Sequence, residues 1–271
     1  MKTVMLLVCS AMYLTSCGSA GPGSTATYVT MQAGQWEYAV IPDNNATPMF
    51  IDFNQPIASG SLAASNALIF NAADISFPGA NEPYYCGGFN LNANISESTL
   101  KGNMSWGQPS VHFANISGTL GPNGQSLTNG HYSGQLCTVS TGPGSPSSNI
   151  NGTMTGYTIS PVNGTFTGTL NSTQDGALVV TLSITQNPDF SLNVAGTFVE
   201  NGVTSVFVPT TTPQSDIVRG ATLTIAGTAK NINDSQPASL SGHLNPSATQ
   251  ISIAVMNIGS DGTITGALTK Q

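Results

Sequence analysis

Charged side chains are scarce in this chain, and their scarcity excludes several classes of protein. Lysine and arginine together account for only 5 of 271 residues, against 12 aspartates and glutamates, so the formal net charge is −7. Nucleic acids and anionic lipid headgroups are bound through clustered Lys and Arg. We therefore expect no nucleic-acid partner and no binding to an anionic lipid surface, and we expect Ser, Thr, Asn and Gln to keep the protein hydrated.

Motifs that carry catalytic or metal chemistry are also missing. The sequence has no Gly-x-Ser-x-Gly nucleophile elbow, no Gly-Lys pair of a phosphate-binding loop and no Gly-x-Gly-x-x-Gly. Only three histidines occur, and none has a second ligand at a helical or strand spacing, so no zinc pattern is visible. The sequence therefore predicts no enzyme activity, no cofactor and no metal site.

The individual histidines and carboxylates are expected to be solvated or structural. His243 lies opposite Leu240 and Leu244 in strand parity, which predicts a solvent-facing ring. The parity at His112 is ambiguous. His131 matches an inward position in the repeat described below but also follows Asn-Gly, which leaves a cavity-lining position and a rim position open. The following acidic residues of the first half are predicted to be scattered surface groups: Glu37, Asp52, Asp74, Glu82 and Glu97.

After its first 16 residues, the chain shows no convincing run of apolar residues at the 3.6-residue spacing of a helix, and strand patterns dominate instead. Apolar and polar residues alternate over segments such as 178–185, 190–198 and 251–255, and a period of two predicts strands with one buried face. Asn-Gly or Asp-Gly pairs, which favour two-residue hairpin turns, begin at positions 123, 129, 151, 163, 175, 201 and 261. The sequence therefore predicts an all-β protein of antiparallel meanders rather than a disordered chain.

A long internal repeat divides the chain into two halves. Three pairs of segments match: 34–36 with 164–166, 116–122 with 240–246, and 151–156 with 261–266. We therefore predict two tandem modules, residues 33–160 and 161–271, with about eight strands each. An eight-stranded meander has no unpaired edge if it closes into a barrel, so barrel-like modules are favoured, with a two-sheet sandwich as the alternative.

The first residues have the layout of a secretory signal peptide. Lys2 supplies a positive charge, residues 4–14 form an apolar run, and Leu14-Thr15-Ser16 leads to Cys17. The run is too short for a spanning helix, which needs about 20 apolar residues. Leu-Thr-Ser-Cys resembles the lipobox of bacterial lipoproteins, and the chain is broadly similar to such lipoproteins with tandem β-rich domains of unknown function. Ordinary cleavage after Ala20 is the competing interpretation.

The resemblance to lipoproteins implies both an anchor and a location. It implies a signal peptide over residues 1–16, a lipid-modified Cys17 and a tether over residues 17–32. Several acyl chains give stable membrane anchoring where one alone is marginal. Gly18 stands where an Asp would resemble a signal for inner-membrane retention. The resemblance therefore implies a cell-envelope protein anchored in the outer membrane, on either the periplasmic face or the cell surface.

Cysteine usage predicts one disulfide. Of the four cysteines, Cys9 leaves with the signal peptide and Cys17 carries the lipid, so Cys86 and Cys137 remain as a pair in an oxidising compartment. Their bridge would close a loop of about 50 residues and contribute roughly 4 kcal/mol on the chain-entropy model. Two separate thiols are the alternative.

These features favour a lipid-anchored, non-catalytic envelope protein with a structural or adhesive role. The alternative is binding of a glycan or a small hydrophobic molecule, either in a barrel cavity that His131 could line or at Tyr84-Tyr85, whose rings could stack on a sugar. A third interpretation is a transmembrane β-barrel, which short strands and an aromatic content of only 7% disfavour. No feature of the sequence predicts an oligomeric state.

Overall fold

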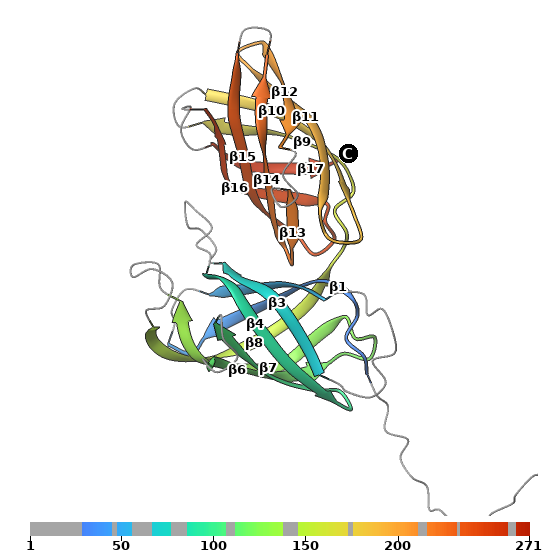
Figure 1. The fold of residues 1–271 in the computed structure, drawn as a ribbon, viewed down its shortest axis with the longest axis vertical. Coiled ribbons are helices and arrows are strands. Elements are labelled where there is room, and N and C mark those ends of the chain that lie inside the picture. The colour runs from blue at the N-terminus through green and yellow to red at the C-terminus, as the bar shows by residue number, and fades with distance from the viewer. Residues whose placement is uncertain are drawn as a thin grey trace, which may run out of the picture.

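A computed structural model of the chain shows two β-modules stacked along its long axis (Figure 1). It describes residues 29–44, 48–55, 67–76, 86–106, 112–137, 146–172, 176–210, 216–231, 234–259 and 264–271. Every secondary-structure element assigned in these ranges is a β-strand, which confirms the predicted all-β fold of two tandem barrel-like modules. Within the same ranges there is no helix of the length and apolarity needed to cross a bilayer.

The first module is a closed barrel of eight strands. In chain order these are β1 (Gly34–Pro42), β2 (Met49–Gln55), β3 (Ala67–Ser76), β4 (Cys86–Ser96), β5 (Thr99–Trp106), β6 (His112–Leu120), β7 (Ser126–Cys137) and β8 (Pro146–Ile159). Each strand pairs antiparallel with the next, and β8 returns to pair with β1 along eight residues. Closure leaves no strand edge unpaired, so this module is a barrel and not a sandwich.

The second module is a nine-stranded sheet that curls on itself. Its strands are β9 (Gly164–Ser172), β10 (Gly176–Gln186), β11 (Leu192–Glu200), β12 (Val203–Pro209), β13 (Ile217–Arg219), β14 (Thr222–Lys230), β15 (Ser235–Leu244), β16 (Gln250–Ile258) and β17 (Ile264–Lys270). The order is β12-β11-β10-β9-β17-β16-β15-β14-β13, and β12 also pairs with β14. The short β13 pairs with the start of β14 at the end of the module that faces the first barrel (Figure 1).

Matching segments of the repeat occupy corresponding strands. Residues 34–36 and 164–166 begin the first strands of the two modules, β1 and β9, while 151–156 and 264–266 lie in the last strands, β8 and β17. Trp36 and Phe166 are both completely buried, so the repeated aromatic position is a core position in each module. Gly34 and Gly164 adopt φ values of 135° and 129°, which glycine tolerates and other residues rarely adopt.

Each module has its own hydrophobic core. In the first, the Phe53 ring stacks parallel to Trp36 at 6.4 Å and meets the Tyr38 ring edge-on at 4.9 Å, with all three side chains fully buried. The core of the second module is mainly aliphatic and packs around residues such as Phe166 and Leu182. The described core side chains of the first module line the interior of its barrel, where an eight-stranded barrel is expected to hold them.

The Asn-Gly pairs mark turns at only some of the predicted positions. Asn201 and Gly202, with φ values of 47° and 79°, form the two-residue turn between β11 and β12 as predicted. The predicted turn at residues 151–152 is wrong, because both lie inside β8. A Cβ on Gly152 would lie 2.6 Å from the carbonyl oxygen of Ile41, so this glycine permits close strand approach. Residues 129–130 lie within β7 beside a register shift, which is a bulge and not a turn.

Candidate functional site

The outer face of β1, β2 and β8 is covered by the second module. Because Trp36 and Tyr38 fill the barrel, the alternating side chains of Gln35 and Glu37 point outward. These two and Asp52 of β2 are nevertheless at most 1% exposed. We call the outward residues Gln35, Glu37, Phe50, Asp52, Asn54 and Tyr157 the junction face.

Hydrogen bonds fix the β13–β14 turn of the second module to the junction face. The Gln35 amide donates to the Gly220 carbonyl at 2.8 Å, and the Asn54 amide donates to the Val218 carbonyl at 2.8 Å while its oxygen accepts from the Gly220 N–H at 3.0 Å. Gly220 has φ 53°, and a Cβ there would lie 2.4 Å from the Trp36 carbonyl oxygen. The turn therefore needs glycine to approach the barrel so closely.

Four ionisable side chains meet beside this turn, and we call them the junction cluster: Glu37, Asp52, Tyr157 and His243. Glu37 and Asp52 are direct cross-strand partners in β1 and β2, and Tyr157 pairs with Glu37 from β8. His243 comes from β15 of the second module. The Tyr157 hydroxyl donates to Glu37 Oε1, and His243 Nε2 makes an ion pair with Glu37 Oε2.

Asp52 is held by the second module's backbone as well as by the cluster. Its Oδ1 accepts from the Ala221 N–H at 2.8 Å, and its Oδ2 accepts from the Thr222 hydroxyl at 2.9 Å. The His243 ring packs near the Phe50 ring, with centroids 5.3 Å apart, and the His243 side chain remains 36% exposed. The cluster therefore has two buried carboxylates and one imidazole that reaches solvent.

Burial and mutual repulsion shift the protonation of these groups. Burial first, and then the charge of Glu37, raise the pKa of Asp52 to about 7, although His243 and the bonds from Ala221 and Thr222 favour its ionised form. Burial opposes the charged form of His243, but the hydrogen bond and charge of Glu37 outweigh it and raise the His243 pKa. Burial and the contact with Glu37 raise the pKa of Tyr157, which therefore stays a neutral donor.

Strand parity placed His243 on the outward face of its strand but did not show that the other module meets that face. The predicted surface positions of Glu37 and Asp52 are wrong, because the second module covers them. The His243 side chain was predicted to face solvent and is only partly exposed, because it contacts Glu37. One sequence signal could have pointed to them. In the repeat, Glu37 corresponds to Thr167, and Thr167 pairs with Thr181 as Glu37 pairs with Asp52.

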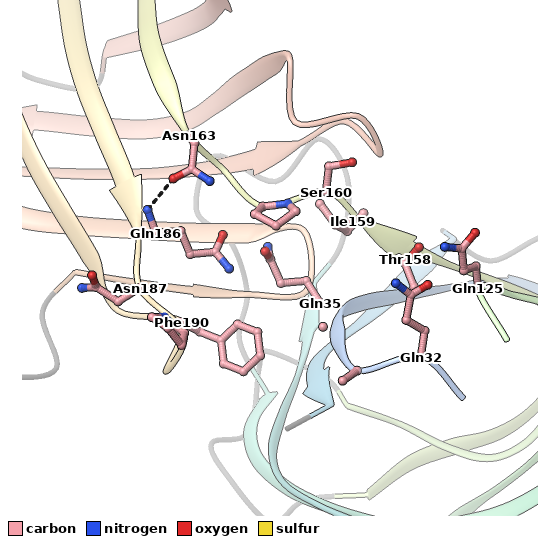
Figure 2. Close-up of a pocket in the computed structure, with 14 residues that line it drawn as sticks. Gln32, Gln35, Gln125, Thr158, Ile159, Ser160, Asn163, Gln186, Asn187 and Phe190 are labelled. Carbon is pink, nitrogen blue, oxygen red and sulfur yellow. Dashed lines mark hydrogen bonds between the residues drawn. The ribbon is translucent and has the colours of Figure 1, made fainter. Parts of the chain in front are cut away.

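A cleft of about 540 Å³ lies between the modules, and Gln35 of the junction face is one of its lining residues (Figure 2). None of its 14 lining residues is charged. Six carry primary amides, and they come from both modules: Gln32, Gln35, Gln125, Asn163, Gln186 and Asn187. Figure 2 shows the Phe190 ring facing the cleft beside Gln35. The lining therefore combines many hydrogen-bonding groups of no net charge with one aromatic face.

The loop between β10 and β11 holds Phe190 in an unusual backbone conformation. Its φ of 68° is rare for a bulky residue. The loop is fixed by bonds from the Asn187 N–H to the Ser191 carbonyl at 2.8 Å and from the Val218 N–H to the Phe190 carbonyl at 3.1 Å. Asp189 further accepts from the Ser191 N–H and hydroxyl. Strain that the surroundings maintain is common at ligand-binding positions.

The cleft wall is preorganised by its own hydrogen bonds. The Gln186 side-chain oxygen accepts from the Val162 N–H at 2.9 Å, and the Gln186 N–H donates to Asn163 Oδ1 at 2.9 Å (Figure 2). These bonds fix the segment that joins the two modules against the end of β10. Amide groups held in this way can meet ligand hydroxyls without first ordering themselves.

The residues singled out from the sequence lie elsewhere. His131 is exposed on β7 between the buried Gly130 and Tyr132, so its ring faces outward and not into the barrel. Cys17, Tyr84 and Tyr85 lie outside the described residues. Cys86 begins β4 and Cys137 ends β7, while their side chains are outside the description.

No protein-family model matches the chain, and no curated protein matches it.

Proposed function

We propose that this protein is a lipid-anchored, non-catalytic component of the bacterial cell envelope with a structural or adhesive role. The signal-peptide pattern ending at Cys17 supports the anchor. Two separately packed modules joined by a hydrogen-bonded interface support a rigid body held out from a membrane. The sparse charge and the absence of known nucleophile motifs from the sequence support a role without catalysis.

The anchor is tested by Cys17→Ala in the full chain expressed with its leader. We expect the wild type to sediment with membranes and to incorporate radiolabelled palmitate, and we expect the variant to do neither. Cys9→Ala, in the leader, is the matched control and should leave both results unchanged. Labelling that persists in Cys17→Ala would contradict the proposed anchor.

The predicted disulfide belongs to the same proposal. Non-reducing peptide mapping of exported protein should recover the peptides of Cys86 and Cys137 as one linked species that reduction separates. Quantitative alkylation of both thiols before reduction would contradict it.

We further propose that the cleft between the modules binds a neutral, hydroxyl-rich ligand, and an oligosaccharide fits this chemistry best. The observation that carries this proposal is the lining of six primary amides and one aromatic ring with no charged residue. Sugar hydroxyls pair with amide donors and acceptors, and a sugar ring can stack on an aromatic face. Ligand-binding pockets commonly have volumes of about 300–1,000 Å³ and often lie between domains.

A titration with chitohexaose, cellohexaose and maltohexaose, followed by protein NMR, tests this site. We expect one of them to shift the amide side-chain signals of Gln35 and Gln186. Phe190→Gly should weaken that binding at least about tenfold, because it removes the ring while glycine accepts the positive φ. Asn201→Gly is the matched control, because it changes another positive-φ position in an exposed turn. Absence of shifts with all three sugars, or unchanged binding by Phe190→Gly, would contradict the proposal.

A further inference from the structure

We propose that Glu37, Asp52 and His243 form a binding site for a divalent first-row transition ion, with Zn²⁺ the best fit, which joins the two modules. This site is separate from the amide-lined cleft and does not depend on its ligand. The sequence predicted no metal, because no two of these residues have a recognisable ligand spacing. The fold brings them together from β1, β2 and β15.

The ligand atoms already converge. One oxygen of Glu37, one oxygen of Asp52 and one ring nitrogen of His243 all lie within 4.8 Å of one another. In a tetrahedral zinc site with bonds of about 2.0–2.2 Å, ligand atoms lie roughly 3.3–3.6 Å apart. Because His243 Nε2 and Glu37 already touch, small shifts of the ring and of the carboxylates would make room for one ion between the three ligand atoms and leave a fourth position for water.

A divalent cation would complement the charges of the junction cluster. Two carboxylates face each other across β1 and β2 with both side chains fully buried, and His243 is the only member of the cluster that can carry a positive charge. Like charges opposed in this way destabilise a sheet, and buried charges without compensation are costly. A divalent ion would compensate both carboxylates at once.

Surrounding groups are placed to support coordination. The Ala221 N–H and the Thr222 hydroxyl orient the Asp52 carboxylate, and the Tyr157 hydroxyl orients Glu37. At metal sites, groups that hydrogen-bond to a metal-binding side chain fix the orientation of that side chain. His243 is partly exposed, which provides an entry path from solvent.

The donor set selects the type of ion. One imidazole nitrogen with two carboxylates suits zinc and its neighbours, whereas Mg²⁺ and Ca²⁺ prefer oxygen ligands alone and Cu(I) prefers sulfur. The metal would replace Glu37 as the partner of His243 Nε2, so the proton on that nitrogen must leave when the ion binds.

The test is metal binding by the full chain after EDTA treatment and dialysis. With ZnCl2 we expect one ion per chain by mass spectrometry of the metal, and with CoCl2 we expect visible absorption bands of a low-symmetry site. His243→Gln should weaken zinc binding at least about 100-fold, as losing one of three ligands requires. Asp52→Asn should also weaken it, and near-native circular dichroism of either variant shows that the loss is local.

His131→Gln is the matched control, because it removes an exposed histidine of the first barrel and should leave binding unchanged. Three results would overturn the proposal: no stoichiometric zinc in the wild type at 100-fold molar excess, binding unchanged in His243→Gln, or thiolate charge-transfer bands with Co²⁺. The last result would place the ion on Cys86 or Cys137.

Discussion

The first strand pair of each module, β1–β2 in the first and β9–β10 in the second, has similar residues on its inner face and different residues on its outer face. Inside, Trp36 pairs with Phe53 in the first module and Phe166 pairs with Leu182 in the second, and all four are buried. Outside, the neighbouring pair is Glu37–Asp52 in the first module and Thr167–Thr181 in the second. The acid pair is fully buried under the second module, whereas the threonine pair is partly exposed.

This difference separates what the barrel needs from what the junction needs. A threonine pair suits a strand face that water reaches, because threonine is uncharged and favours β-structure. The second module carries a threonine pair at this outer position and still forms a barrel-like sheet. An acid pair at this position is therefore not required for the fold. The acid pair is present where another module supplies the partners Ala221, Thr222 and His243.

The largest expected effect concerns the shared inner face. Trp36→Ala and Phe166→Ala should each destabilise their module by about 3–5 kcal/mol, because each leaves a cavity at a fully buried position. Urea unfolding followed by tryptophan fluorescence and circular dichroism measures both costs. If one substitution cost less than about 1 kcal/mol, the two aromatic positions would not be equivalent in the core.

The pH dependence of stability should come from the outer acid pair. The folded-state pKa of Asp52 is raised to about 7, above its value of about 3.9 in an unfolded chain, so the folded state holds this proton more tightly. The resulting stability is complete below about pH 4 and is lost as the pH rises to about 7, with a change of at most about 4 kcal/mol. The raised pKa of His243 acts in the same direction at higher pH.

Metal-free wild type and Asp52→Asn, unfolded in urea between pH 4 and pH 8, isolate this contribution. The variant should lack the loss of stability between pH 4 and pH 7, while the other carboxylates affect both proteins equally. A wild type whose stability, relative to the variant, does not fall across this range would contradict burial of an acid pair.

Truncation of the two outer pairs should have unequal costs. Asp52→Ala leaves the Ala221 N–H and the Thr222 hydroxyl without their acceptor, and an unsatisfied buried group costs about 1–3 kcal/mol. Thr181→Ala on the partly exposed pair should cost less than about 1 kcal/mol. Thermal unfolding near pH 7 compares them, and equal costs would remove the distinction between the junction face and its counterpart.

The smallest effect is expected from copying the acid pair into the second module. Thr167→Glu combined with Thr181→Asp places two carboxylates opposite each other where water reaches them, which should cost at most about 1 kcal/mol. The double variant should show no additional pH-dependent loss of stability near pH 7. Such a loss would mean that strand pairing alone, without a covering module, raises the pKa of this pair.

The sequence predicted the modules well because strand periodicity and the repeat are local signals. Alternation assigned the strands, and the repeat matched Trp36 with Phe166 at corresponding core positions. Turn prediction failed at Asn151-Gly152, where the glycine serves close strand packing instead of a hairpin. Local chemistry alone does not distinguish these two uses of glycine.

The candidate site could not be predicted, because it depends on how one module meets the other. Parity predicted that His243 faces outward, but Glu37, the residue that it contacts, lies 206 residues away along the chain in the other module. The amides that line the cleft also come from both modules, and single Gln and Asn residues carry no pattern in a sequence rich in both. The one local sign of the junction in the sequence is that Glu37 and Asp52 stand where the second module has Thr167 and Thr181.

The most direct test of a buried acid pair at the junction is the titration of the Asp52 carboxyl carbon by NMR in the metal-free full chain. The signal is assigned by its loss in Asp52→Asn. We predict a midpoint close to pH 7, because burial and the charge of Glu37 disfavour ionisation. A midpoint close to 4, the value of a solvated aspartate, would show that the second module does not cover this face and would contradict the account.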